Sequence, residues 1–302
     1  MVSLATYRLL TPPDEEQEIY PYRRVWRSLA LESAILFAIT GAVYVLYNYI
    51  GIRLPDALNR PANVALALLP VGLWLVFSLW REQFALEPRR RLVAVAIASA
   101  LVANAIGIPF VDNVLQPERW LPLSGTMNRI IGYAFTVGVV QETLKYLVVR
   151  YLAWEDCFRV RLDSVAYTSA SAIGYATVAA LSYVLSNTLA PDVAALRVAE
   201  FYAVHMAASL IVSYGLSEVR FANPNPFLLA GTVALGALLT GFVIAFRSGL
   251  VNAGFSLEGA APSFLFGLGL SIAAFTGVAV VFAFLYENAE RRAREAAAAR
   301  EV

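Results

Sequence analysis

The segment Gln141-Glu142-Thr143-Leu144-Lys145 lies in the middle of an apolar stretch that covers residues 130–152. Lys145 is the single lysine of a chain that carries 22 arginines, and it follows Glu142 by one helical turn. An ionisable side chain at the centre of a bilayer costs about 2.5–3.5 kcal/mol on insertion scales, so such residues often mark functional sites. The segment therefore indicates a polar site inside a membrane-spanning helix.

The composition of the whole chain is that of a polytopic membrane protein. Its 302 residues are 59% hydrophobic and 15% charged, with a mean hydropathy of +0.64, whereas soluble domains average about 25% charged residues. The formal net charge of +1 argues against a nucleic-acid-binding protein, because binding to phosphates needs a basic surface. A single cysteine, Cys157, excludes an internal disulfide and a cysteine-based metal cluster.

Eight apolar stretches are long enough to cross a hydrocarbon core of ~30 Å, which takes about 17–25 helical residues. They cover residues 29–52, 62–80, 92–111, 130–152, 164–185, 201–216, 227–246 and 263–286. We therefore predict an all-α bundle of about eight transmembrane helices over residues 29–286. A cytoplasmic N-terminal segment, residues 1–28, precedes it, and a charged helical tail, residues 287–302, follows. Glu32 is expected to lie near the headgroups and to reach water.

The arginines predict the orientation of this bundle. With eight spans, 16 arginines fall on the side that holds both termini and 6 fall on the opposite side. Arginine-rich loops face the cytoplasm, so we expect a multi-pass protein of the cell membrane with both termini cytoplasmic. The first 28 residues lack the apolar core of a signal peptide, which predicts that no leader is removed.

Three polar residues of the 130–152 stretch can share one side of a helix. Gln141 and Lys145 are spaced i, i+4, and Glu142 and Lys145 are spaced i, i+3. At ~1.5 Å per helical residue, the only histidine, His205, lies about 16 Å from the cytoplasmic end of its span, and Glu142 about 9–12 Å. The two side chains can therefore meet. The simpler alternative is that Glu142 and Lys145 only neutralise each other and that His205 is a packing residue.

The fifth span is rich in small side chains, which allow helices to approach closely in lipid. We therefore expect this helix at the centre of the bundle. Its small residues are Ser164, Ser169, Ala170, Ser171, Ala172, Gly174, Ala176, Thr177, Ala179 and Ala180.

Together these segments resemble the PrsW family of polytopic intramembrane proteases. Residues 141–145 are similar to the family motif EExxK, and Asp163 is similar to a loop aspartate that leads into a Gly/Ala-rich helix. His205-Met206-Ala207-Ala208-Ser209 resembles the family's histidine motif. The resemblance implies a PrsW-like core over about residues 130–246. It also implies Glu142 and His205 as the groups that bind a metal or activate water, with Lys145 and Gln141 beside them.

The same resemblance shows four departures from the family pattern. The first glutamate is Gln141, the family's FxxxE glutamate falls on Ala179 and the following asparagine on Ala180, and the late histidine falls near Gly236. A metal-assisted hydrolase typically keeps three protein ligands and a water. The two remaining candidate groups cannot fill these roles.

The leading prediction is therefore a catalytically degenerate PrsW-like protein that binds or scaffolds other integral membrane proteins in the lipid bilayer. The alternative is an active intramembrane protease that cleaves membrane proteins, with Glu142 and His205 holding a divalent metal such as zinc. A third hypothesis, a small-solute transporter, would use Glu142, Lys145 and His205 as a relay, but the chain shows no internal repeat of the kind many transporters have. None of these three hypotheses includes a nucleic-acid partner.

Overall fold

The computed structural model describes residues 25–84, 88–222, 225, 227–250, 254 and 263–298, and the regular structure of these residues is all helical. Within this part of the chain, seven helical segments are long and apolar enough to cross a membrane. They are Val25–Ile50, Asp56–Glu82, Leu92–Leu123, Arg161–Ser186, Pro191–Phe221, Leu228–Phe246 and Phe264–Arg292. The predicted N-terminal segment lies outside the described residues except for its last four positions.

An eighth helical segment corresponds to the predicted fourth span. Helix α7 (Thr126–Tyr133), the π-helical turn η7 (Ala134–Gly138) and α8 (Val139–Leu152) follow one another without a break. This segment is not among the seven because its polar residues lower its hydropathy. The all-α fold with eight long helical segments is therefore confirmed for the described residues.

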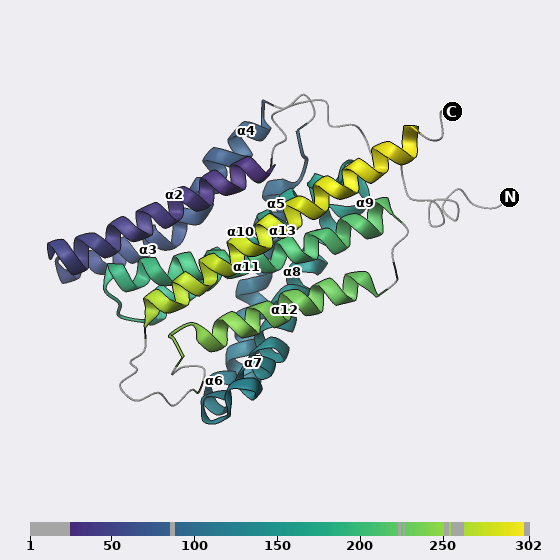
Figure 1. The fold of residues 1–302 in the computed structure, drawn as a ribbon. Helices are drawn as coiled ribbons and strands as arrows, with labels where there is room; N and C mark the ends of the chain where they lie inside the picture. Colours follow the sequence, from purple (N-terminus) through teal and green to yellow (C-terminus); the bar gives the residue numbers. More distant parts are fainter. Residues whose placement is uncertain are drawn as a thin grey trace.

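Helices α10 (Arg161–Ser186) and α11 (Pro191–Phe221) form the centre of the bundle (Figure 1). Helix α11 packs against α10, α12 (Leu228–Phe246), α13 (Phe264–Ala298) and α2 (Val25–Val45). In Figure 1, α2 and α3 (Asp56–Trp74) lie to one side of α11, and α7 and α12 lie to the other.

The sixth span, predicted as residues 201–216, proves to be a helix of 31 residues. It is also the most buried span, with 94% of its apolar window inside the bundle. Hydropathy missed its first turns because Arg197 and Glu200 lie there. In the structure Arg197 Nη1 lies 2.6 Å from Glu200 Oε2, so the two charges offset each other.

The small residues of α10 allow close contact with α5 (Leu92–Val102), as expected from the sequence. A Cβ atom added to Gly174 would lie 2.1 Å from the carbonyl oxygen of Ala96, so only glycine fits at this crossing. The hydroxyl of Ser99 donates to the carbonyl of Ser171 at 2.7 Å, and the hydroxyl of Ser171 donates to Ser99 Oγ at 3.0 Å. Such contacts replace the hydrophobic drive between helices in lipid.

Five π-helical turns interrupt the described helices, and the sequence analysis predicted none of them. They are η2 (Leu46–Ile50), η3 (Leu75–Leu79), η4 (Ala103–Gly107), η5 (Phe110–Leu115) and η7. The short elements are α4 (Trp80–Glu82), α6 (Pro117–Trp120), η6 (Leu121–Leu123) and α9 (Trp154–Cys157). One π turn, η7, directly precedes the helix that carries Glu142.

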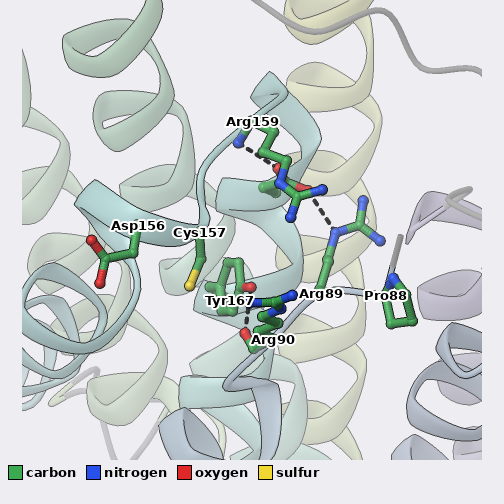
Figure 2. A pocket seen from close by; sticks show the side chains of 8 residues that line it. Pro88, Arg89, Arg90, Asp156, Cys157, Arg159 and Tyr167 are labelled. Atoms are coloured by element: carbon green, nitrogen blue, oxygen red, sulfur yellow. Dashed lines mark hydrogen bonds and ion pairs between the residues drawn. The ribbon is translucent and has the colours of Figure 1, made fainter. Parts of the chain in front are cut away.

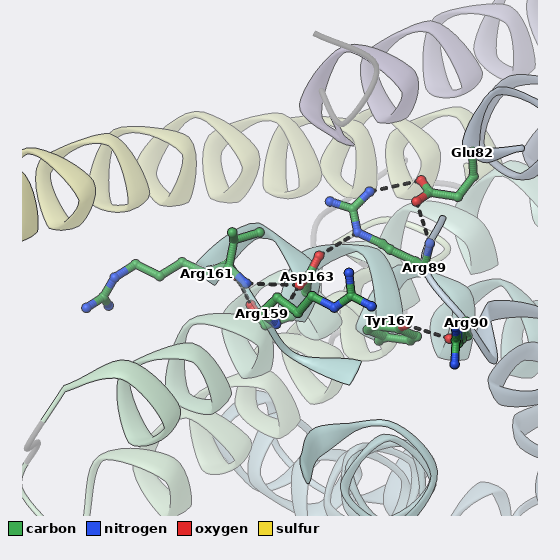
Figure 3. A network of polar contacts seen from close by, with 9 residues as sticks. Glu82, Arg89, Arg90, Arg159, Arg161, Asp163 and Tyr167 are labelled. Atoms are coloured by element: carbon green, nitrogen blue, oxygen red, sulfur yellow. Dashed lines mark hydrogen bonds and ion pairs between the residues drawn. The ribbon is translucent and has the colours of Figure 1, made fainter. Parts of the chain in front are cut away.

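A network of buried charges joins the starts of α5 and α10 at the arginine-rich end of the bundle (Figure 3). Arg89 lies 2.9 Å from Glu82 and 2.6 Å from Asp163. Asp163 also accepts hydrogen bonds from the backbone N–H of Arg159, at 2.8 Å, and of Val160, at 3.0 Å, which caps α10. Burial alone would lower the pKa of Arg89, but the charges of Asp163 and Glu82 raise it above its ordinary value.

A small open pocket lies beside this network (Figure 2). Arg89, Arg90, Asp156 and Tyr167 line it together with Cys157, which is half-buried. The Tyr167 hydroxyl donates to the carbonyl of Arg90 at 2.6 Å, which fixes the loop before α5 against α10.

The environment of Glu32 differs from the expected one. Helix α2 begins by Val25, so Glu32 lies about two turns along it, and its side chain is buried at 2% exposure. The hydroxyl of Ser78, in the π turn η3, donates to Glu32 Oε1. The side chain is therefore buried against α3 and α10, where it lines a small cavity, and does not lie at the exposed surface as expected.

Candidate functional site

Glu142 and Lys145 form a buried ion pair on α8. The Lys145 Nζ atom lies 2.8 Å from Glu142 Oε1, and the two side chains are 3% and 1% exposed. The pair follows from the i, i+3 spacing read in the sequence. Removing two charges from water is costly, so such a pair needs further hydrogen bonds to be stable.

Lys145 obtains these further contacts from α11. Its Nζ atom donates to Ser209 Oγ at 3.0 Å and to the backbone carbonyl of His205 at 3.3 Å. With the Glu142 carboxylate, the ammonium group thus has three acceptors for its three hydrogens. Lys145 therefore joins α8 to α11 as a charged cross-link.

Helix α12 covers Glu142 on another side, through Gly236. A Cβ atom added to Gly236 would lie 3.5 Å from Glu142 Cγ and 3.2 Å from the carbonyl oxygen of Ala208 on α11. The position that the PrsW resemblance matches with the family's late histidine therefore faces Glu142. In this chain the glycine instead lets the backbone of α12 approach α11 and α8.

His205 is buried on α11 at 2% exposure, against an aromatic side chain of α10. The centroids of the His205 and Tyr175 rings are 5.1 Å apart. His205 Nδ1, the Tyr175 hydroxyl and both carboxylate oxygens of Glu142 are buried without a hydrogen-bond partner, although Glu142 Oε1 lies in the ion pair with Lys145. An unsatisfied buried polar group costs about 1–3 kcal/mol, so a bound water or ion would stabilise each of these groups.

The structure brings Glu142, Lys145 and the backbone of His205 together beside α10, whereas the His205 ring packs against Tyr175 and does not line the cavity at the ion pair. Gln141 is only half-buried and does not line the cavity at the ion pair. That cavity has a volume of about 10 Å³ and is bounded by Glu142, Lys145, Ser171 and Ser209 among others. It is at the lower limit for a single water, so a peptide segment has no room there in this state.

A resident metal ion would need several ligating side chains that converge on one point. Among the described residues, no group of three or more His, Cys, Asp or Glu side chains could hold a metal. A catalytic zinc site typically has three protein ligands and a water. Glu142 and His205 supply two groups at most, and Glu142 is already paired with Lys145. The described residues therefore do not fit a three-ligand metal centre.

Residues 87–285 match the profile of the PrsW family, described as intramembrane metalloproteases. The chain belongs to the PrsW family. It is also similar to Protease PrsW of Clostridioides difficile (strain 630), with 24% identity over 164 residues that cover 53% of this chain and 67% of that protein. No solved structure matches significantly. The resemblance seen in the sequence is thus confirmed, and the family region extends beyond the expected core to the loop before α5 and to α13.

Two residues of this region gained a role only in the structure. Tyr175 and Ser209 hold His205 and Lys145, yet neither belongs to the set of candidates drawn from the sequence. A serine one turn after His205 was a usable signal, because i, i+4 residues share a helix face. Tyr175 gave no such signal, since its contact with His205 joins two helices that are far apart in sequence.

Proposed function

We propose that this PrsW-family protein has lost hydrolytic activity and binds transmembrane segments of other integral membrane proteins. The observation that carries the proposal is the state of Glu142. Its carboxylate is paired with Lys145 at 2.8 Å, and the described residues offer no third metal-ligating side chain.

The chemistry of peptide hydrolysis supports this proposal. Hydrolysis needs a local water, a group that deprotonates it and donors that stabilise the oxyanion. Here Lys145 is engaged by three acceptors, and the family positions at Ala179 and Gly236 carry no polar side chain. Loss of a single oxyanion donor can reduce a rate by about 10²–10³, so loss of several groups should leave turnover near background.

An active intramembrane protease is the second candidate function, and one specific observation favours it. Glu142 Oε2, His205 Nδ1 and the Tyr175 hydroxyl are buried without partners. A divalent metal such as zinc, or a bound water, would satisfy such atoms. The third hypothesis, a solute transporter, gains no comparable support, because the cavity at Lys145 measures only about 10 Å³.

The deciding experiment is a cleavage assay in proteoliposomes on single-span substrates, with and without added zinc. The wild-type chain is compared with its Glu142→Gln variant, and Protease PrsW of Clostridioides difficile serves as the positive control. We expect no cleavage above background from either form of this chain, and photocrosslinking of the intact substrate to the chain. Robust cleavage by the wild type that disappears in Glu142→Gln would establish the protease instead.

A further inference from the structure

A second polar cavity lies between α2, the segment η3–α4 and the start of α10. It has a volume of about 30 Å³ and shares no lining residue with the cavity at Lys145. Its oxygen-bearing side chains include Glu32 and Ser28 from α2, Ser78 from η3 and Ser169 from α10. This volume is enough for one or two water-sized guests.

Glu32 is the exceptional group in this cavity because it lacks a basic partner. The other fully buried acids among the described residues pair with arginine or lysine: Glu82 and Asp163 with Arg89, Glu142 with Lys145, and Glu200 with Arg197. Among the described residues, Glu32 receives a hydrogen bond from the Ser78 hydroxyl only. An isolated buried carboxylate is strongly disfavoured, so it either takes up a proton or is compensated by a positive charge.

The cations described at this cavity have other partners. Arg81 and Arg89 line the cavity, together with Glu82. Arg89 is held by Glu82 and Asp163, and the Arg81 guanidinium lies over the ring of Phe77, 5.9 Å from its centroid. The lining thus holds two carboxylates and two arginines, but neither arginine is ion-paired with Glu32.

Ser169 gives independent evidence for a guest. Its side chain is buried at 6% exposure, its hydroxyl has no hydrogen-bond partner, and it lines the same cavity as Glu32. An unsatisfied hydroxyl beside an uncompensated carboxylate is an arrangement that oxygen-seeking cations use, since they take carboxylate and other oxygen ligands. The position of Ser78 in a π-helical turn agrees with this, because such turns are frequent at functional sites.

We propose that this cavity binds a small monovalent metal cation of the Na⁺ class. The Glu32 carboxylate neutralises the ion, and the hydroxyls of Ser28, Ser78 and Ser169 provide further oxygen ligands. A single carboxylate without an ion-pair partner favours a monovalent ion, and the small volume excludes organic cations such as choline. A bound ion would connect α2 to η3 and α10, and so hold the N-terminal helices against the centre of the bundle.

The test uses the purified full-length chain in detergent micelles. Thermal unfolding is followed while NaCl replaces choline chloride at constant ionic strength, and binding of radioactive sodium is measured on the same samples. A ligand that binds only the folded state raises its stability progressively above the dissociation constant. We expect Na⁺ to raise the unfolding temperature of the wild type and to bind saturably, with one ion per chain.

Three variants decide whether the ion lies at Glu32. Glu32→Gln should remove the Na⁺-dependent shift and, in choline, unfold at the same or a higher temperature than the wild type, because the buried charge is gone. Ser169→Ala should lower the apparent affinity by several-fold. Ser271→Ala is the matched control, since Ser271 is a buried serine on α13 whose hydroxyl donates to the carbonyl of Gly267 in its own helix. This control should keep the full Na⁺ response.

Three outcomes overturn the proposal. An unfolding temperature that is the same in NaCl and in choline chloride, without sodium binding, excludes the site. A Na⁺ response that survives Glu32→Gln places the ion elsewhere. If the unfolding temperature follows pH but not Na⁺, and Glu32→Gln removes that pH response, Glu32 holds a proton and the metal proposal fails.

Discussion

Gly236 lies against Glu142, so that a Cβ atom on this glycine would be 3.5 Å from the Glu142 Cγ atom. The same Cβ atom would be 3.2 Å from the carbonyl oxygen of Ala208, which is a tight but not impossible contact. A side chain at position 236 therefore points towards Glu142 and the backbone of α11 at Ala208. This relationship makes the proposed loss of a metal centre open to direct test.

The first prediction is that Gly236→His introduces zinc binding. A histidine at this position would add a third nitrogen or oxygen ligand beside Glu142, as catalytic zinc sites require. We expect zinc to raise the unfolding temperature of the variant and not that of the wild type. Gly236→Ala measures the steric cost of the added Cβ without a ligand. Zinc stabilisation of the wild type equal to that of the variant would contradict the proposed absence of a metal site.

The second prediction is that Lys145→Ala destabilises the bundle. It leaves the Glu142 carboxylate buried without its partner and removes the contacts to Ser209 and His205. Breaking one side of a buried ion pair costs about 3–5 kcal/mol. Lys145→Met combined with Glu142→Gln should recover most of that loss, because no charge remains. Unfolding in detergent provides the measurement, and a Lys145→Ala variant as stable as the wild type would show that the ammonium contributes nothing.

The third prediction concerns Arg89. Arg89→Ala leaves Glu82 and Asp163 as buried carboxylates without their arginine, with an expected loss of about 3–5 kcal/mol. Arg89→Lys should lose less, because lysine keeps the charge but lacks the planar fork that contacts both carboxylates. The exposed Arg91, which pairs with Asp156 at 2.8 Å, gives a matched control, and Arg91→Ala should cost under about 1 kcal/mol.

The sign of the pH dependence follows from the raised pKa of Arg89, in which the charges of Asp163 and Glu82 outweigh the lowering by burial. When folding raises the pKa of a basic group, that group stabilises the folded protein fully at any pH below its pKa in the unfolded chain. The contribution is lost only as the pH rises above that pKa. The pKa of arginine in an unfolded chain lies far above pH 9. Arg89 should therefore not make the free energy of unfolding of the wild type depend on pH between neutral pH and pH 9. A steep loss of stability over that interval that is absent in Arg89→Lys would contradict this assignment.

The fourth prediction is a topology with both termini in the cytoplasm. Cys157, the single cysteine, is half-buried in the loop region that the arginine distribution assigns to the cytoplasm. A membrane-impermeant maleimide should therefore label the wild type only after the cells are opened. In a Cys157→Ser background, Val302→Cys should behave in the same way, whereas Arg53→Cys should react in intact cells. External labelling at Val302 would rule out the eight-span arrangement.

Local patterns in the sequence predicted much of the fold. The i, i+3 spacing of Glu142 and Lys145 predicted their ion pair, and the small residues around Gly174 predicted a central helix. Each of these features depends on residues that are close in sequence, where helix geometry alone fixes which side chains meet.

Contacts between distant segments could not be predicted in this way. Nothing near Glu32 in the sequence indicates Ser78 as its partner, because their hydrogen bond joins α2 to a π turn 46 residues later. The span predicted for α11 was likewise too short. Hydropathy counts Arg197 and Glu200 as polar, although the two charges neutralise each other in the structure. In the sequence, Gly236 is notable only as a position near which the resemblance expects a histidine. The structure shows that this glycine lets α12 pack closely against α8 and α11.

The π-helical turn η7, Ala134–Gly138, has a consequence for gene variation in this family region. A π turn holds one residue more than an ordinary α-helical turn. Deleting one residue between positions 134 and 138 would therefore restore ordinary α-helical winding and leave Glu142 and Lys145 close to their present orientation. Deleting Val140, in the regular helix α8, would instead rotate Glu142 and Lys145 by about 100° relative to α7. We expect the second deletion to be as damaging as loss of Lys145 and the first to be tolerated far better, although both remove only an apolar or small residue.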